Sequence, residues 1–409
     1  MLIALFLSSI VPVVGGLTGD GNLNNLAGAA NSISAVMAGV VLGFTIWKQI
    51  ERFHGVNDVS YVFWSFLPAF MAVTAIVLLF RLDCVPLVLA AGFAVSLSWF
   101  VFVHYYVYAN RRPRFHIIPG GDVARMWKVE GLDLFEAREL FCGRSNRAES
   151  DGFVVDFGHR HRQKTREFIA DLTVHGVPVY HYKHLEERLT GKVSFELPHE
   201  NTFGSLLPNL FYLKVKQGLD IIAAVALILL LAPLFILLAA AIFVCDGRPI
   251  LFSQRRMGYR GRPFTAFKFR TMVQPAKALT ETDAAHAMTQ PGDPRITPLG
   301  RILREKRLDE LPQLFNVLRG EMSMIGPRPE ALELERIYRS RLANYAYRHA
   351  VRPGISGWAQ VTQGHVTAVC DVEEKLKYDF YYIKNLSPWL DFLILLKTIR
   401  TVVVGFGAR

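Results

Sequence analysis

Cysteine is scarce in this chain: only Cys84, Cys142, Cys245 and Cys370 occur among 409 residues. The four are scattered, and no two of them form a C-x-x-C pair. This pattern argues against a disulfide framework and against a zinc site built on cysteine. We therefore expect reduced thiols.

Two further signatures of bound cofactors are missing. The run GFVVDFG at 152–158 resembles the start of a nucleotide-binding unit, but no G-x-G-x-x-G motif follows it. Gly120 and Gly121, after an earlier apolar run, are too little to indicate a cofactor. Several histidines lie between positions 159 and 184, but their spacings match no metal-ligand pattern, so we interpret them as surface residues. They are His159, His161, His175, His181 and His184.

Acidic residues are outnumbered, with 35 Asp and Glu against 46 Lys and Arg, for a net charge of +11. Hydrophobic residues make up 51% of the chain, and the mean hydropathy is +0.25. These values predict a membrane protein with substantial soluble parts. Because apolar segments bracket the basic runs, lipid headgroups and phosphorylated substrates suit this charge better than nucleic acid does.

Four apolar segments precede the first long polar stretch, roughly Leu2–Leu17, Ser32–Trp47, Tyr61–Phe80 and Val85–Tyr108. A helix needs about 20 apolar residues to cross a bilayer, which the last two segments satisfy directly. The first has the length of a signal peptide but lacks a basic start, so we predict a span. Residues 1–110 are thus predicted to form a four-helix transmembrane region. No ionisable residue lies deep in these segments, which favours an anchor or a dimerisation region over a transport pathway.

Loop charges predict the orientation of these spans. Lys48 and Arg52 follow the second segment, and a basic cluster from Arg111 to Arg114 follows the fourth. The positive-inside rule places the N-terminus and everything after Arg111 in the cytoplasm. Arg81, after the third segment, is the one loop charge that does not fit this orientation. We therefore predict a membrane protein whose soluble parts lie on the cytoplasmic face of the membrane.

Residues 111–200 are predicted to form a small cytoplasmic α/β domain of Rossmann-like type. Apolar runs at 115–119, 152–158 and 177–182 indicate buried strands, and helical patterns fall at 163–174 and 185–189. Strands that alternate with helices are typical of a parallel sheet. For this domain, regulation, assembly or scaffolding is favoured over catalysis.

Residues 201–409 are predicted to form the catalytic domain, which begins with an uncharged run from Ile221 to Val244. Pro233 lies at its middle, and basic residues flank both ends, so both ends are expected in the cytoplasm. Each half has about 12 residues, or roughly 18 Å of helix, well short of a core of about 30 Å. We predict a re-entrant helix–break–helix over 218–245 with its break at Pro233; a span kinked by Pro233 is the alternative.

The adjacent carboxylates Asp309 and Glu310 stand among Arg301, Arg304 and Arg307, just ahead of a helix predicted after Pro312. One carboxylate can attack phosphorus, a second can hold a divalent cation, and arginines can neutralise phosphate oxygens. The alternative is that the two acids cap the helix and offset the neighbouring arginines.

An ordered set of motifs from Lys216 to about Thr398 resembles one family, the polyprenyl-phosphate hexose-1-phosphate transferases. These are the monotopic phosphoglycosyl transferases of bacterial surface-polysaccharide synthesis, and the chain is similar to their large members. The matching elements are K-x-x-x-D at 216–220, Pro233 at the middle of the re-entrant segment, FSQRRMGYRGRPFTAFKFRTM, DPRITPLGRILR, LDELPQLFNVLRGEMSMIGPRPE, RPGISGWAQV and LSPWLDFLILLKTI.

The resemblance implies transfer of a sugar 1-phosphate from a UDP-sugar to undecaprenyl phosphate, with release of UMP. It implies Asp309 as the nucleophile of an aspartyl–phosphosugar intermediate and Glu310 as the residue that binds Mg²⁺. Glucose or galactose is the favoured sugar, and an N-acetylated sugar is the alternative. A non-catalytic scaffold for polysaccharide assembly is the rival hypothesis, although the intact carboxylate pair argues against it. A homodimer is plausible, and no nucleic-acid partner is expected.

Further residues are candidates for phosphate binding. Arg328 stands between Pro327 and Pro329, a stiff presentation that suits a bidentate phosphate contact, although a plain turn is the alternative. A predicted interfacial helix over 390–403 would lie on the membrane, with a packed core helix as its alternative. The remaining candidates are Lys268, Arg270, Arg301, Arg304 and Arg352.

Overall fold

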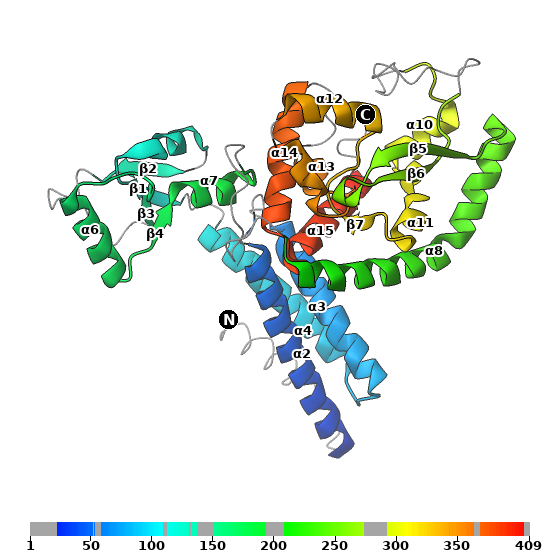
Figure 1. The fold of residues 1–409 in the computed structure, drawn as a ribbon. Helices are drawn as coiled ribbons and strands as arrows, with labels where there is room; N and C mark the ends of the chain where they lie inside the picture. The colour runs from blue at the N-terminus through cyan, green and yellow to red at the C-terminus, as the bar shows by residue number, and fades with distance from the viewer. Residues whose placement is uncertain are drawn as a thin grey trace. The chain divides into compact units, whose positions relative to one another are not determined.

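The computed structural model describes residues 23–51, 53, 59–108, 113–130, 132–137, 151–193, 208–273, 293–342, 344–363 and 369–404. The first predicted span, the basic residues at 111 and 112, and the polar insert at 274–292 lie outside these residues. The chain divides into two compact units, 1–191 and 192–409. Figure 1 shows the elements of each.

Three long helices open the first unit: α2 (Leu23–Ile50), α3 (Ser60–Leu79) and α4 (Pro86–Val103), which continues as a π-helical turn, His104–Tyr108. All three are long and apolar enough to cross a membrane. The second to fourth predicted segments are confirmed as helices, although α2 starts well before Ser32.

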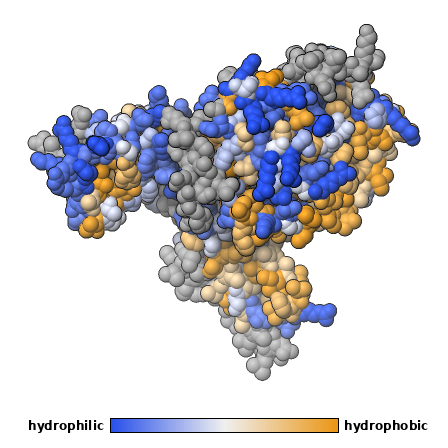
Figure 2. Space-filling model, viewed as in Figure 1, coloured by the Kyte–Doolittle hydropathy of each residue, from blue (hydrophilic) through white to orange (hydrophobic). Residues whose placement is uncertain are grey.

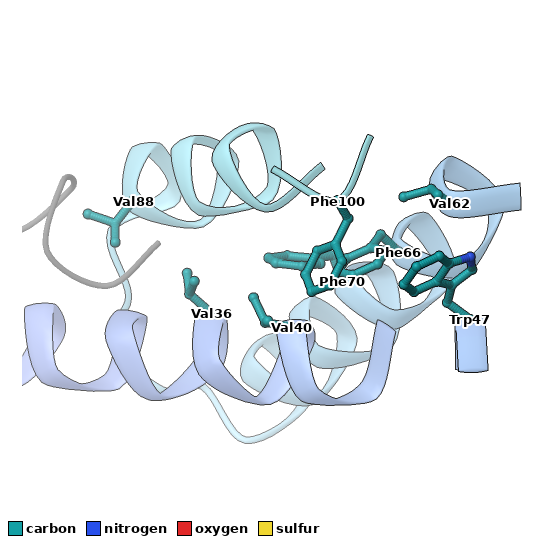
Figure 3. Packing of buried hydrophobic residues seen from close by; sticks show 8 residues of the cluster. All are labelled: Val36, Val40, Trp47, Val62, Phe66, Phe70, Val88 and Phe100. Carbon is teal, nitrogen blue, oxygen red and sulfur yellow. The ribbon is translucent and has the colours of Figure 1, made fainter. Parts of the chain in front are cut away.

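The three helices pack through large apolar side chains that interlock at close range (Figure 3). Phe66 from α3 and Phe100 from α4 have ring centroids 4.7 Å apart. Glycines of α2 and α4 allow the close approach: a Cβ at Gly43 would lie 2.7 Å from the Phe66 ring, and one at Gly92 would lie 2.5 Å from Val36. The glycines of the second segment therefore serve packing. The cluster comprises Val36, Val40, Trp47, Val62, Phe66, Phe70, Val88 and Phe100.

A four-stranded parallel sheet completes the first unit, with strand order β2–β1–β3–β4. The strands are β1 (Arg114–Ile117), β2 (Asp133–Glu136), β3 (Gly152–Val155) and β4 (Val179–His181). The predicted parallel sheet is confirmed. Strand β2 was missed because it is short and at the sheet edge, with only two apolar residues, neither of them buried.

Helical segments cover both faces of this sheet. Val123 and Met126 of the 3₁₀ helix η2 (Gly121–Lys128) pack on one face together with Tyr182 and Leu185 of α7 (Tyr182–Thr190). Leu172 of α6 (Gln163–Val174) packs on the other face. Both predicted helices are confirmed, and α7 begins three residues before its predicted start.

The second unit opens with α8 (Leu210–Asp246), a single helix of 37 residues with Pro233 inside it. The predicted interruption at Pro233 is wrong: the proline removes one main-chain hydrogen bond, while the leucines and alanines on both sides favour helix. Figure 1 shows α8 bending along its length. Ala224 is buried before the proline and Leu238 and Ile242 after it, so one face packs on the unit along both halves.

The opposite face of α8 stays apolar and exposed, and apolar residues gather along this side of the unit in Figure 2. By length and hydropathy α8 is also able to cross a membrane. Its re-entrant course in one leaflet therefore stays a prediction. The exposed residues include Leu219, Ile222, Leu229, Leu230, Ile236, Leu237 and Val244.

Two small sheets and several short helices fill the curve of α8. Strands β5 (Leu251–Met257) and β6 (Pro263–Phe269) form an antiparallel hairpin, and β7 (Ser323–Ile325) pairs in parallel with β8 (Gly354–Ser356). The described helices after α8 are η4 (Tyr259–Gly261), α10 (Pro298–Glu305), η5 (Leu308–Glu310), α11 (Gln313–Leu318), α12 (Leu332–Arg341), η6 (Tyr345–Ala350), α13 (Trp358–Thr362), α14 (Val369–Lys384) and α15 (Pro388–Val404).

The helix predicted near the C-terminus, α15, is mostly a packed helix. Leu390, Leu393 and Ile394 are fully buried, whereas Leu395 and Ile399 keep 44% and 38% of their surface exposed. The packed alternative thus accounts for most of its apolar surface. A membrane contact through the remaining edge stays a prediction.

Candidate active site

Asp309 and Glu310 lie in the single turn η5, directly after α10. Arg307, with φ of 55°, turns the chain between α10 and η5. Leu308 and Leu311 flank the acids and pack into the cluster that contains Leu303 and Ile242 of α8. The two carboxylates are consequently buried, with 8% and 7% of their residue surface exposed.

Two cations converge on one oxygen of Glu310. Lys268, from the end of β6, places Nζ 2.7 Å from Glu310 Oε1, and Arg328, after β7, donates from Nη2 to the same oxygen at 2.8 Å. Lys268 Nζ also lies 4.0 Å from Asp309 Oδ2. The structure therefore brings four predicted residues, Asp309, Glu310, Lys268 and Arg328, into one buried group.

The strand that carries Lys268 is fixed by a buried amide. Asn316 of α11 is fully buried, accepts from the Phe267 main-chain N–H at 3.1 Å and donates to the Thr265 carbonyl at 2.7 Å. This helix-to-strand contact sets the position of β6 relative to η5. Asn316 is a supporting residue that sequence reasoning did not identify.

The neighbouring acids have opposite pKa shifts. Burial raises the pKa of Asp309, and Lys268, Arg328 and Arg304 offset only part of this effect. Burial alone would also raise the pKa of Glu310, but the charges and hydrogen bonds of Arg328 and Lys268 outweigh it, so the pKa lies well below its usual range. Glu310 is therefore the more strongly stabilised anion, and Asp309 is the more basic carboxylate of the pair.

The other predicted cations divide into near and distant ones. Arg304 is half-buried, and its charge lowers the pKa of Asp309, whereas Arg301 is exposed. Arg270 donates to the carbonyls of Met272 and Arg248, because it follows the last residue of β6. Arg352 donates to the Gly320 carbonyl and lies over the Tyr259 ring. The structure does not bring Arg270 and Arg352 to the acids.

The segment that carries Arg328 lies against the start of β8. The Pro327 carbonyl accepts from the Gly354 N–H at 3.0 Å. A Cβ at Gly326 or at Gly354 would collide with the other's backbone or its neighbours. The RPGISG motif, whose role the sequence did not reveal, thus packs the Pro-Arg-Pro segment closely.

Arg256 of β5 is a further buried cation near this group. Its Nη1 donates to the Pro329 carbonyl at 2.6 Å, and burial with the nearby charge of Arg328 lowers its pKa to about 10. Strand alternation could have identified it: the β5–β6 register pairs Arg256 with Phe264 and Phe252 with Lys268, so Arg256 and Lys268 share one face of the hairpin.

The donor set suits a divalent cation only in combination with a substrate. Lys268 and Arg328 both bind Oε1 of Glu310, so Oε2 is not committed to these two bonds. Within the described ranges, no group of three or more His, Cys, Asp or Glu side chains can hold a metal by itself. One or two carboxylates completed by substrate phosphates is a common arrangement for Mg²⁺.

Comparison with known proteins identifies the class. The family described as bacterial sugar transferase matches residues 211–405. The UDP-N-acetylgalactosamine-undecaprenyl-phosphate N-acetylgalactosaminephosphotransferase of Aeromonas hydrophila is 37% identical over 389 residues, 95% of this chain and 88% of that protein. The undecaprenyl-phosphate glucose phosphotransferase of Komagataeibacter xylinus is 43% identical over 198 residues, 47% of this chain and 36% of that protein. The UDP-glucose:undecaprenyl-phosphate glucose-1-phosphate transferase of Caulobacter vibrioides is 41% identical over 207 residues, 50% of this chain and 76% of that protein.

The chain therefore belongs to the bacterial sugar transferase family. Within it, the predicted membership of the polyprenyl-phosphate hexose-1-phosphate transferases is confirmed, and the protein is a membrane-associated enzyme of that class. The likeness to the Aeromonas hydrophila protein extends over most of the first unit as well, because it covers 95% of the chain.

Proposed function

We propose that this enzyme transfers a sugar 1-phosphate from a UDP-sugar to undecaprenyl phosphate and releases UMP, as the first membrane step of surface-polysaccharide synthesis. The observation that carries the proposal is the buried group of Asp309, Glu310, Lys268 and Arg328. It pairs a basic carboxylate with fixed cations, which phosphoryl transfer needs more than it needs acid–base groups.

The proposed reaction has two displacements at one phosphorus atom. Asp309 attacks the phosphorus next to the sugar, a new O–P bond forms, and the bond to UMP breaks, so that UMP leaves with the bridging oxygen. An oxygen of undecaprenyl phosphate then attacks the same phosphorus and regenerates the Asp309 carboxylate. Lys268, Arg328 and the nearby Arg256 would neutralise charge on the transferred phosphate.

Mg²⁺ belongs to this proposal as a cofactor, with Glu310 as its protein ligand. When bound, it would supply neutralisation of the diphosphate and so permit an anionic nucleophile to approach. Because Lys268 and Arg328 already bind one oxygen of Glu310, the chain keeps that carboxylate ionised and oriented in the absence of substrate.

The course of α8 supports a reaction at one membrane face. A helix that packs on the second unit both before and after Pro233 has no long free stretch with which to cross the bilayer. Its exposed apolar face would enter one leaflet, and the acids would remain at headgroup height. We propose that the reaction takes place at the cytoplasmic side of the inner membrane, which is the side that the loop charges predict.

The full-length likeness now favours an N-acetylhexosamine donor over glucose or galactose. The relative that this chain matches over 389 residues carries N-acetylgalactosamine in its name, whereas the relatives named for glucose match half of the chain or less. UDP-N-acetylgalactosamine is therefore the first donor to test, and UDP-glucose is the second.

The decisive experiment measures UMP release by the purified full-length protein with Mg²⁺, undecaprenyl phosphate and each UDP-sugar in turn. We expect release from one donor, its loss in Asp309→Asn, and its loss when EDTA removes Mg²⁺. Glu305→Gln, an exposed acid on α10, is the matched control and should keep the wild-type rate. No release from any UDP-sugar would overturn the proposed function, and wild-type activity in Asp309→Asn would overturn the covalent course.

A further inference from the structure

We propose that Arg348 is a positioning residue for the transfer, because it holds the main chain of Arg328 and thereby keeps the Arg328 guanidinium on Glu310. This inference rests on the proposed function. Arg348 lies in η6, twenty residues beyond Arg328, and only 4% of its surface is exposed. It is too deeply buried for a surface role.

The guanidinium of Arg348 donates hydrogen bonds to three different residues. Nη2 donates to the Arg328 carbonyl at 2.7 Å and to Asp379 Oδ2 at 2.9 Å, and Nη1 donates to the Tyr345 hydroxyl at 2.6 Å. Asp379, on α14, is 2% exposed and supplies the nearer counter-charge, and Glu330 Oε1 lies 4.0 Å from Nη1. The group therefore ties the segment after β7 to η6 and α14.

The Pro-Arg-Pro segment depends on such contacts because its prolines lack N–H donors. Neither Pro327 nor Pro329 can contribute a main-chain donor, so the carbonyls carry much of the attachment. The carbonyls of Arg328 and Pro329 accept from the buried guanidiniums of Arg348 and Arg256, respectively. The main chain of Arg328 is thus held from behind while its side chain points to Glu310.

A lysine at position 348 would retain the charge and the pairing with Asp379 but not this geometry. The planar fork of arginine reaches three partners in fixed directions, whereas a single ammonium cannot reproduce that arrangement. Displacement of a catalytic group by about 1 Å can lower a rate roughly 100-fold. A substitution at Arg348 should therefore lower the rate of the transfer, although Arg348 does not contact Glu310.

The test is a double-mutant cycle between Arg348→Lys and Arg328→Lys, measured as kcat for UMP release by the full-length protein. We expect Arg348→Lys to lower kcat roughly 10- to 100-fold in the wild-type background and less than about twofold in the Arg328→Lys background, since the two substitutions act through one contact. Glu335→Gln is the matched control: Glu335 is 2% exposed and pairs with His349 of the same η6 segment. It should lower the melting temperature and leave kcat within about twofold.

The outcomes separate this inference from the proposed function. No UMP release by the wild type would overturn both. If the wild type releases UMP but Arg348→Lys lowers kcat by the same factor in the wild-type and Arg328→Lys backgrounds, the positioning role alone is overturned. If Arg348→Lys does not fold, Asp379→Asn replaces it in the same cycle, because it weakens the support of the Arg348 guanidinium while preserving the shape of the side chain. An additive result there would equally overturn the inference.

Discussion

At the scale of single residues, two neighbouring acids acquire different chemistry from their surroundings. Glu310 receives both Lys268 and Arg328 on one oxygen, whereas Asp309 has Lys268 at 4.0 Å. Burial acts on both acids, but only Glu310 gains enough attraction to reverse the effect. The pair therefore combines a strongly stabilised anion at Glu310 with a more basic carboxylate at Asp309.

The raised pKa of Asp309 predicts the acidic limb of the pH–rate profile. A protonated carboxyl cannot attack phosphorus, so kcat/KM should rise with pH through an apparent pKa above the ordinary 3.8 of an aspartic acid. Lys268→Met removes a charge that lowers the pKa of Asp309, and we expect this limb to move to higher pH. Lys306→Met, at an exposed lysine, is the control. A limb that stays in place in Lys268→Met, or moves to lower pH, would contradict this assignment.

At the scale of elements, charged side chains attach the first half of α8 to the rest of its unit. Lys216 Nζ lies 2.8 Å from Asp391 Oδ2 on α15, and the Tyr212 hydroxyl donates to the same oxygen at 2.6 Å. The Ser323 hydroxyl, at the start of β7, donates to Asp220. The K-x-x-x-D motif therefore joins an apolar helix to the strand that leads to Arg328.

Lys216→Met tests this attachment. The substitution leaves Asp391 and Asp220 buried, at 8% exposure each, without their shared cation. Removing one partner of a buried ion pair costs about 3–5 kcal/mol. We therefore expect Lys216→Met to lower the free energy of unfolding by about 3–5 kcal/mol. Lys214→Met, two residues earlier and exposed, should have little effect. Thermal unfolding of both variants in detergent gives the comparison, and equal melting temperatures would refute a structural role for Lys216.

At the scale of the whole molecule, the proposed chemistry is confined to one compact unit. Every residue assigned to it lies between positions 192 and 409, and the family match covers 211–405. The boundary falls before Lys192, which pairs with Glu374, and the Val193 N–H donates to the Lys377 carbonyl. These two residues belong structurally to the catalytic unit and not to the small sheet.

A shortened chain that begins at Lys192 should therefore keep UMP-releasing activity. The described residues that we assign to the site, and those that position them, all lie in the second unit, so we expect kcat in detergent to remain within a few-fold of the full chain. The same chain with Asp309→Asn should be silent. Complete loss of activity in a shortened chain that still unfolds cooperatively would show that the first unit contributes to the site.

Much of this could be predicted from local sequence patterns. The apolar helices follow from run length, the parallel sheet from the alternation of strands and helices, and the β5–β6 hairpin from paired runs around a turn. Arg270 was misplaced, although Lys268 two residues earlier was not: the strand ends at Phe269, and alternation predicts a side chain's direction only within a strand. Pro233 was expected to break α8, but packing on both sides of it keeps the helix continuous.

The sequence by itself determined the class of enzyme, the carboxylate pair and the long apolar helices, because each depends on residues that are close together in the chain or on an ordered set of motifs. Only the tertiary structure decided that Glu310 accepts the hydrogen bonds of Lys268 and Arg328, and that Arg348 and Arg256 bind the carbonyls of the Pro-Arg-Pro segment. These contacts join residues 18 to 73 positions apart. Their energies depend on burial and direction, which arise only when separate elements pack against one another.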